Sequence, residues 1–291
     1  MMENTLLQVR WQVAIVKRFR SLISSSTMSE KIAIKNKALK VFITGATSGI
    51  GESLANQYAK EGAILGLVGR RLELLKKIKA KIHVPCEIYA VDVSDQKGLQ
   101  KAANHFIKKY GSPDIVIANA GVSTGTLAGE KEDLHTFKRV IEINLFGVIH
   151  TFLPFIKVFK KQKSGQLVGI ASVAGIRGLP GSGAYSTSKA ALINYLESLR
   201  IEMKPFGIHV TTIAPGYIHT PMTKHNRYTM PFILDADVAV SRFIKAIQNK
   251  KSFVIIPWQM KIVGIIMKFL PTSVWDFLAK GGPKKIRKTI Q

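Results

Sequence analysis

Short apolar runs alternate with longer segments of helical periodicity along most of the chain. The runs occupy residues 39–43, 63–68, 86–91, 114–118, 166–171, 208–213 and 252–256. The segments between them, such as IGESLANQYAKEG at 50–62, repeat apolar residues at helical spacing and end in glycine. Almost continuously apolar strands separated by helices predict an α/β fold, with a doubly wound parallel sheet of about seven strands and helices on both faces.

Both ends of the chain fall outside this alternation. We therefore expect a basic N-terminal arm or leader (1–37), one sheet-forming domain (38–256) and a basic C-terminal extension (257–291). The apolar run Val13–Val16 in the arm is too short for the core of a signal peptide.

The extension carries an amphipathic pattern between Pro257 and Pro271. Its broad apolar face comprises Trp258, Ile262, Ile265, Ile266 and Phe269, and the opposite stripe comprises Lys261, Gly264 and Lys268. The uninterrupted run 262–267 is far shorter than the ~20 residues that span a bilayer. A basic tail follows, with Lys284, Lys285, Arg287 and Lys288. The pattern favours an interfacial helix on anionic lipid, and the alternative is packing against the protein's own core or a second subunit.

Charge and composition narrow the classes of partner. The chain has 43 Lys and Arg against 18 Asp and Glu, a formal net charge of +25, which attracts polyanions. No nucleic-acid motif accompanies this charge, so no specific nucleic-acid partner is expected. The single cysteine, Cys86, excludes an intramolecular disulfide. The histidines at 135, 150 and 219 lack the paired spacing of a zinc site, and no metal site is expected.

A glycine-rich turn, TGATSGIG at 44–51, directly follows the first apolar run. Glycines at 45, 49 and 51 let main-chain N–H groups approach a pyrophosphate where a helix begins. The alternative is a tight turn whose small residues serve packing. The strand before the turn and the helix after it favour a dinucleotide site.

Arginines stand where the second strand ends. NAD sites usually place Asp or Glu there, whereas a cation suits the 2′-phosphate of NADP. Here the sequence is Gly69, Arg70, Arg71, with no carboxylate before Glu73. NADP is therefore favoured over NAD, the alternative being that the arginines only begin a solvated helix.

Polar residues also follow the third and fourth strands. Asp92 either accepts a hydrogen bond from an adenine amino group or is a polar strand end beside a Ser94 helix cap. Asn119 and Gly121 in ANAG stand where the backbone passes close to a ligand at the strand ends.

Tyr185 and Lys189 are four residues apart in AYSTSKAAL. On a helix they share one face, and a nearby positive charge favours the phenolate. The pair is either an acid–base device or two residues on a solvated helix face.

In their order along the chain, these motifs resemble those of the short-chain dehydrogenase/reductase family. The matching elements are TGxxxGxG at 44–51, NAG at 119–121, Asn144 in INLFG, Ser172 in ASVAG, YxxxK at 185–189, and Pro215–Gly216 with Thr220 beyond. The match covers residues 38–256, and Ala118 departs from the family's frequent asparagine. The two ends of the chain have no counterpart in the family's core pattern.

The resemblance implies a Rossmann-type fold and a role for each matching residue. Tyr185 would donate the proton, Lys189 would lower its pKa together with an oxidised nicotinamide, and Ser172 would hold the carbonyl. Asn144 would position a water in a relay to Lys189. The implied cofactor-binding residues are Gly45, Thr47, Ser48, Gly49, Ile50, Gly51, Arg70, Arg71, Asp92, Val93, Asn119, Gly121, Tyr185, Lys189, Pro215, Gly216, Ile218 and Thr220.

These expectations combine into one functional hypothesis. The chain would be an NADP-dependent oxidoreductase that acts on a carbonyl or alcohol of a lipophilic small molecule, with specificity residing in the loop 217–234. The alternatives are an NAD-linked alcohol dehydrogenase and a non-catalytic basic binding protein on the same fold. We also expect a homo-oligomer and a cytoplasmic location, with peripheral contact to the inner face of a membrane through the extension.

Overall fold

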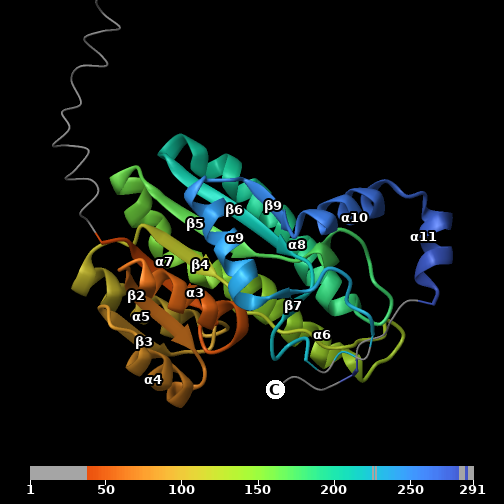
Figure 1. Ribbon diagram of the computed structural model, residues 1–291, viewed down its shortest axis with the longest axis horizontal. Helices are drawn as coiled ribbons and strands as arrows, with labels where there is room; N and C mark the ends of the chain where they lie inside the picture. Colours follow the sequence, from red (N-terminus) through yellow and green to blue (C-terminus); the bar gives the residue numbers. More distant parts are fainter. Residues whose placement is uncertain (1–37, 225, 227, 282–285, 288–291) are drawn as a thin grey trace, which may run out of the picture. The chain divides into compact units, whose positions relative to one another are not determined.

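A seven-stranded parallel sheet forms the centre of the described part of the protein, as the computed structural model shows (Figure 1). Its strands are β1 (Lys40–Thr44), β2 (Ile64–Gly69), β3 (Cys86–Ala90), β4 (Ile115–Ala118), β5 (Gly165–Ile170), β6 (Ile208–Pro215) and β9 (Phe253–Ile256). They lie in the order β3-β2-β1-β4-β5-β6-β9, and every neighbouring pair is parallel. The predicted α/β sheet is therefore confirmed.

The structure describes residues 38–224, 226, 228–281 and 286–287. The described residues from Leu39 onward belong to one compact unit. The expected N-terminal arm, 1–37, lies outside the described residues, as do three of the four cations of the expected basic tail.

Helices cover both faces of the sheet, and each face has its own apolar core. One core takes side chains from α3 (Gly49–Lys60), α4 (Leu72–Lys81) and α9 (Ala236–Gln248). The other takes side chains from α5 (Gln96–Tyr110), α7 (Gly147–Gln162) and α8 (Gly183–Met203), including the fully buried rings of Phe106, Phe155 and Phe159. Helix α6 (Asp133–Ile141) packs beside α8. Because both faces are covered, the strands are apolar on both sides, which explains the runs seen in the sequence.

One continuous helix, Asp133–Gln162, joins α6 and α7 through a π-helical turn at Glu142–Phe146. Among the described residues it alone meets the length and composition expected of a helix that crosses a membrane. Phe152, Phe155 and Phe159 on this helix are fully buried in the core. Its apolar character therefore belongs to the packing of the domain.

The sheet order reverses between β1 and β4, which are direct neighbours. Connections leave these two strands in opposite directions, so a crevice opens at their carboxyl ends. The short pair β7 (Ile218–His219) and β8 (Leu234–Asp235) brackets the loop between them at the same end of the sheet. Short 3₁₀ turns lie at Val173–Gly175 and Lys204–Phe206.

The extension forms two helices, α10 (Trp258–Phe269) and α11 (Thr272–Ala279). The helix expected between the two prolines is present, but the expectation for its polar stripe was wrong at Gly264. This glycine is buried, and a Cβ there would meet Ile176 and Ile255, so this side of α10 packs on the domain. Arg287 was expected in a lipid-binding tail, yet its Nε lies 3.1 Å from Asp133 Oδ2.

Candidate active site

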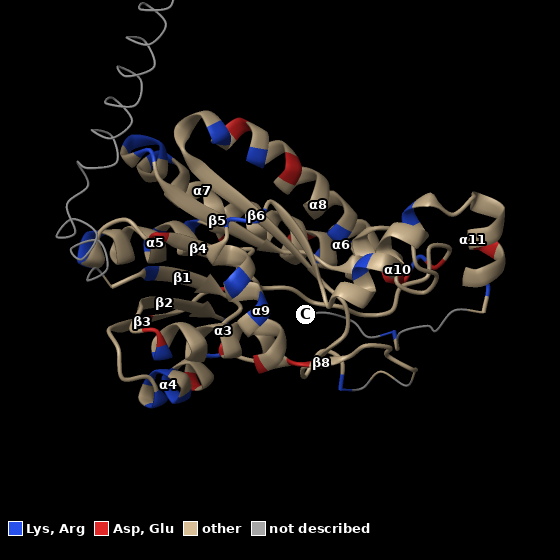
Figure 2. Ribbon diagram, turned by 45° about the horizontal axis from the view of Figure 1, so that its top comes forward, with Lys and Arg blue, Asp and Glu red and all other residues tan. Residues whose placement is uncertain are grey.

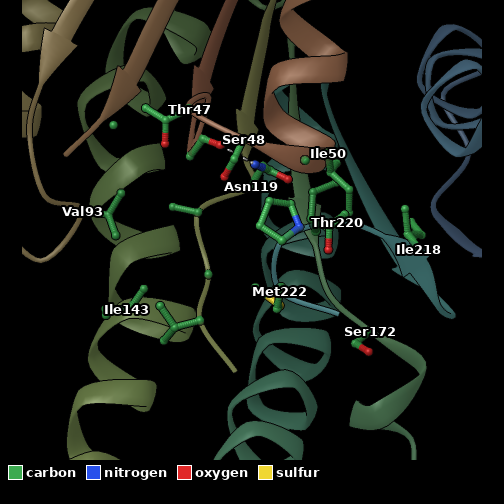
Figure 3. A pocket seen from close by; sticks show the side chains of 18 of the residues that line it. Thr47, Ser48, Ile50, Val93, Asn119, Ile143, Ser172, Ile218, Thr220 and Met222 are labelled. Atoms are coloured by element: carbon green, nitrogen blue, oxygen red, sulfur yellow. Dashed lines mark hydrogen bonds between the residues drawn. The ribbon is translucent and has the colours of Figure 1, made fainter. Parts of the chain in front are cut away.

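A single cleft at the carboxyl ends of the strands gathers almost all of the predicted site residues (Figure 3). The exceptions are Gly51 and Asn144, which do not line it. Figure 3 shows Thr47, Ser48 and Asn119 together near the start of α3, with Ser172 lying apart from them. The cleft thus has one end at the glycine-rich turn and another at the predicted acid–base residues.

The glycine-rich turn fits a pyrophosphate. Gly45 and Gly49 have φ values of +70° and +56°, which favour glycine. A Cβ on Gly45 would lie 2.6 Å from Ala120 Cα, so the backbone approaches its neighbour as closely as it can. The turn leads into the N-terminus of α3, where main-chain N–H groups and the helix dipole attract a phosphate.

Gly51 has a packing role in place of the expected cofactor contact. A Cβ there would lie 2.1 Å from Gly45 O and 2.6 Å from Asn119 Nδ2. Asn119 Nδ2 donates to Thr44 O at 3.2 Å and to Gly45 O at 3.1 Å. The amide of Asn119 therefore ties the end of β4 to the turn, and the missing side chain at 51 leaves room for this tie.

The two arginines after β2 both line the cleft beside the turn. Arg71 Nη2 donates to Thr47 Oγ1 at 2.8 Å and to Ser48 Oγ at 3.0 Å. Arg70 Nη1 lies 3.7 Å from Asp92 Oδ2. Both arginines are exposed where α4 begins, and they border the predicted cofactor site.

Asp92 is held by its neighbours. Its Oδ1 accepts from Ser94 N at 2.9 Å and from Ser94 Oγ at 2.8 Å, and its Oδ2 lies 2.8 Å from Arg139 Nη2. Burial raises the pKa of Asp92, but the Ser94 hydrogen bonds and the charges of Arg139 and Arg70 outweigh it, so the pKa falls below its ordinary value. Asp92 lines the cleft with its charge compensated.

Arg139 is a partner that the sequence analysis missed. It comes from α6, 47 residues after Asp92, and its Nη1 also donates to Ser94 Oγ at 2.9 Å. Only the fold, which brings Arg139 to the loop after β3, reveals this contact, since no motif in the sequence marks it.

Ser172 and Tyr185 meet in the cleft. Ser172 begins the loop after β5, where its Oγ accepts from Ala174 N at 3.1 Å. Burial raises the pKa of the Tyr185 phenol, and a hydrogen bond with Ser172 acts in the opposite direction. The expected lowering of this pKa is not found among the protein's own groups, because desolvation outweighs the Ser172 hydrogen bond. The phenol therefore stays protonated at neutral pH, as a proton donor must.

Lys189 is buried one helical turn beyond Tyr185. Its Nζ donates to Ile170 O at 2.8 Å and lies 5.9 Å from the centroid of the Tyr185 ring. Burial lowers the pKa of Lys189 from 10.5 to about 8. The pair thus faces the cleft on one side of α8, and a solvated helix face does not describe it.

Asn144 does not line the cleft but hydrogen-bonds residues that line it or lie next to it. Its Oδ1 accepts from Val122 N at 2.8 Å, and its Nδ2 donates to Val122 O and Ser188 Oγ, both at 2.9 Å. These bonds occupy the side chain, which holds the loop after β4. The expected water relay from Asn144 to Lys189 stays a prediction. Asn144 does lie in the π-helical turn, a kind of helix defect that is frequent at functional sites.

Two tyrosines of the loop 217–234 lie together, and one of them, Tyr228, lies near Tyr185. The rings of Tyr217 and Tyr228 are 6.2 Å apart. Burial raises the pKa of Tyr228 to about 12, and the charges of Tyr217 and Tyr185 add to the effect. The sequence analysis assigned specificity to this loop without singling out either residue. The approach of Tyr228 to Tyr185 depends on the tertiary structure of the loop.

Histidines in the described part of the chain do not gather with acids or cysteine into a group that could hold a metal ion. His150 Nδ1 lies 3.1 Å from Val93 O, a structural contact.

Comparison with known proteins defines the class. The model of the short chain dehydrogenase family matches residues 39–231, and the chain belongs to this family. An uncharacterized oxidoreductase of Myxococcus xanthus is 33% identical over 241 residues, covering 82% of this chain and 95% of the relative. The 11-beta-hydroxysteroid dehydrogenase-like 2 of Arabidopsis thaliana is 34% identical over 248 residues, covering 82% and 79%.

Solved structures share the fold. An alcohol dehydrogenase of Thermococcus sibiricus complexed with 5-hydroxy-NADP superposes with a TM-score of 0.67 at 24% identity, over 76% of this chain and 96% of that one. The protein is thus an NAD(P)-dependent oxidoreductase of the short-chain dehydrogenase/reductase family.

Proposed function

We propose that this enzyme prefers NADP and transfers hydride between the nicotinamide and a carbonyl or alcohol group of a lipophilic small molecule. The observation that carries the cofactor preference is the position of Arg71. Its guanidinium lies on the hydroxyls of Thr47 and Ser48 at the mouth of the phosphate-binding turn. Among the described residues, no acid forms an ion pair with Arg71.

The single acid of the cleft supports the same preference. Asp92 follows β3, one strand further from the turn than the position at which NAD sites place a carboxylate. Arg139 compensates its charge at 2.8 Å, so Asp92 leaves Arg71 available for a phosphate. A 2′-phosphate would meet an uncompensated cation here, and a charge-assisted contact of this kind is strong.

Apolar walls support a lipophilic substrate. The apolar side chains that line the cleft include Val122, Ile143, Pro221 and Met222. Met222 is 43% exposed and Phe232, in the same loop, is 48% exposed, so both offer apolar surface that the fold does not use. Sites for small molecules are mostly apolar, with a few polar groups that fix orientation.

The acid–base chemistry follows from three residues. The nicotinamide supplies or accepts the hydride. Ser172 and Tyr185 present hydroxyls that can hydrogen-bond one carbonyl oxygen, and Tyr185 gives that oxygen its proton in reduction or removes it in oxidation. Lys189, with its cationic side chain buried beneath, stabilises the phenolate that proton transfer leaves.

The test compares kcat/KM for NADPH and NADH after a screen of ketones, 3-keto lipids and steroids. Arg70→Asp with Arg71→Ala should lower the preference for NADPH roughly ten- to a hundredfold, because a charge-assisted contact contributes about 1.5–3 kcal/mol. Lys76→Asp with Lys77→Ala makes the same change of charge on the exposed side of α4 and should leave the ratio unchanged. An unchanged ratio in the arginine variant would refute the preference.

A further inference from the structure

Large apolar side chains lie open to solvent on both helices of the extension. Phe269 is 76% exposed and Phe277 82% exposed. Together with them, the exposed set, named here the apolar plateau, consists of Trp258, Ile262, Ile265, Ile266, Phe269, Val274, Phe277 and Leu278. A soluble surface rarely gathers so many large apolar residues on two short neighbouring helices, and such a patch marks an interaction site.

The orientation of α10 is fixed by its other side. Met260 and Gly264 are buried, and they touch the domain through Gly216 and Ile176. At 3.6 residues per turn, the five plateau residues of α10 fall within an arc of about 100° on the side away from this contact. The plateau therefore faces outward because the opposite side is held on the domain.

Cations border the plateau. Lys261 and Lys268 are exposed and lie between its edge and the domain. They line a groove with Arg200 of α8, which lies 3.9 Å from Glu197 in the same groove. Lys280 follows α11, and Asp276 is the single acid of the two helices. Figure 2 shows α10 and α11 almost entirely without acidic positions. Lys284, Lys285 and Lys288 continue the basic sequence.

We propose that the apolar plateau docks this enzyme onto an anionic lipid bilayer, with α10 and α11 lying in the interface. An apolar face with lysines along its border is what such a surface recognises, because the apolar side chains enter the acyl boundary while lysines meet phosphates. The helices have 12 and 8 residues, far short of the ~20 that span a bilayer. A second copy fits less well, since pairing two plateaus would bring like charges together.

The helices that carry the plateau are joined to the loop between Ser172 and Tyr185. Arg177 Nη1 donates to Met267 O at 2.8 Å and to Leu270 O at 2.7 Å, and its guanidinium carbon lies 5.2 Å from the centroid of the Trp275 ring. Arg177 belongs to the loop between Ser172 and Tyr185. The two helices are therefore held on the segment that connects these two site residues. If the substrate is lipophilic, as proposed above, docking brings this loop to the membrane in which the substrate dissolves.

The experiment measures co-sedimentation of the full chain with phosphatidylcholine vesicles, with and without phosphatidylserine. Lys261→Glu with Lys268→Glu should lower the partition coefficient on anionic vesicles at least about tenfold. Phe269→Ser with Phe277→Ser should lower it on anionic vesicles by a similar factor, because apolar burial is lost. Both phenylalanines are too exposed for their removal to unfold the domain.

Matched controls separate the plateau from general charge and apolar exposure. Lys97→Glu with Lys101→Glu makes the same charge reversal on α5, and Ile201→Ser removes an apolar side chain that is 61% exposed on α8. Both controls should bind like the wild type. Binding that is equal in all five proteins, or reduced equally by the controls, overturns the proposal. The proposal is also overturned if the wild type does not bind vesicles and is instead a dimer that Phe269→Ser with Phe277→Ser converts to a monomer.

Trp258 gives a second, direct readout that does not depend on activity. In a chain with Trp11→Phe and Trp275→Phe, the plateau residue Trp258 is the remaining tryptophan, and it is 64% exposed. Its emission should shift to shorter wavelength on anionic vesicles and be quenched by lipids brominated on the acyl chain. An unshifted, unquenched Trp258 in vesicle-bound protein would show that another part of the chain makes the contact. Because this readout needs no turnover, its failure is distinguishable from a wrong substrate class.

Discussion

Lys189 carries a cost to stability that its removal should reveal. Its ammonium is buried, and burial lowers its pKa from 10.5 to about 8. A group with a depressed pKa in the folded state lowers stability wherever both states would be protonated, and the penalty fades as the pH rises from 8 towards 10.5. Since one pKa unit corresponds to about 1.4 kcal/mol, the penalty is about 3 kcal/mol at pH 7 and roughly half of that at pH 9.5.

Lys189→Met keeps the aliphatic stem and removes the charge. The variant also loses the hydrogen bond to Ile170 O, which contributes about 1 kcal/mol. The net gain in the free energy of unfolding should therefore be about 2 kcal/mol at pH 7. The difference in the free energy of unfolding between variant and wild type should also shrink by about 2 kcal/mol between pH 7 and pH 9.5. Turnover should be lost although the protein becomes more stable, as expected where a charged group is retained for function.

The assay is urea unfolding of both proteins at several pH values without added cofactor. Lys101→Met removes an exposed lysine of α5 and should leave the pH dependence of stability unchanged, because its charge stays in water. If the difference in the free energy of unfolding between Lys189→Met and wild type stays constant with pH, or grows towards pH 9.5, the Lys189 ammonium is not destabilised by burial.

Two further substitutions test other parts of the site. Tyr185→Phe should lower turnover about 10²–10⁴-fold while NADPH binding, followed by fluorescence titration, stays nearly intact, because only the proton donor is lost; wild-type turnover on a good substrate would contradict the assigned role. Gly51→Ala should weaken NADPH binding and cost about 1–3 kcal/mol of stability, because its Cβ would lie 2.1 Å from Gly45 O. Gly129→Ala, where a Cβ meets nothing within 4 Å, is the matched control, and equal behaviour of the two would sink the packing argument.

The extension shows that the periodicity of a sequence can predict a helix correctly and still assign a residue to the wrong face of it. The apolar spacing of α10 predicted its helix between the two prolines, and α10 runs from Trp258 to Phe269. The same spacing assigned Gly264 to a polar stripe, although Gly264 touches Ile176 and Ile255. A helical wheel gives the angle of a residue around the axis. Which angle meets the domain depends on neighbours that are distant in sequence.

The sequence by itself determined the features that rest on local order. Alternating apolar strands and helices gave the parallel sheet, because burial of both sheet faces leaves a continuous apolar run in each strand. The glycine-rich turn and the spacing of Tyr185 and Lys189 also follow from local geometry, since a φ near +60° favours glycine and about four residues make one helical turn.

Tertiary structure decided the features that rest on burial and on distant partners. Arg139 reaches Asp92 across 47 residues, and Arg287 reaches Asp133 across 154. The pKa of Tyr185 rises where the spacing of the pair predicted a fall, because the packing of α8 against the cleft removes water from the phenol. Desolvation and long-range pairing arise only when the chain has folded, so no motif in the sequence encodes their sign.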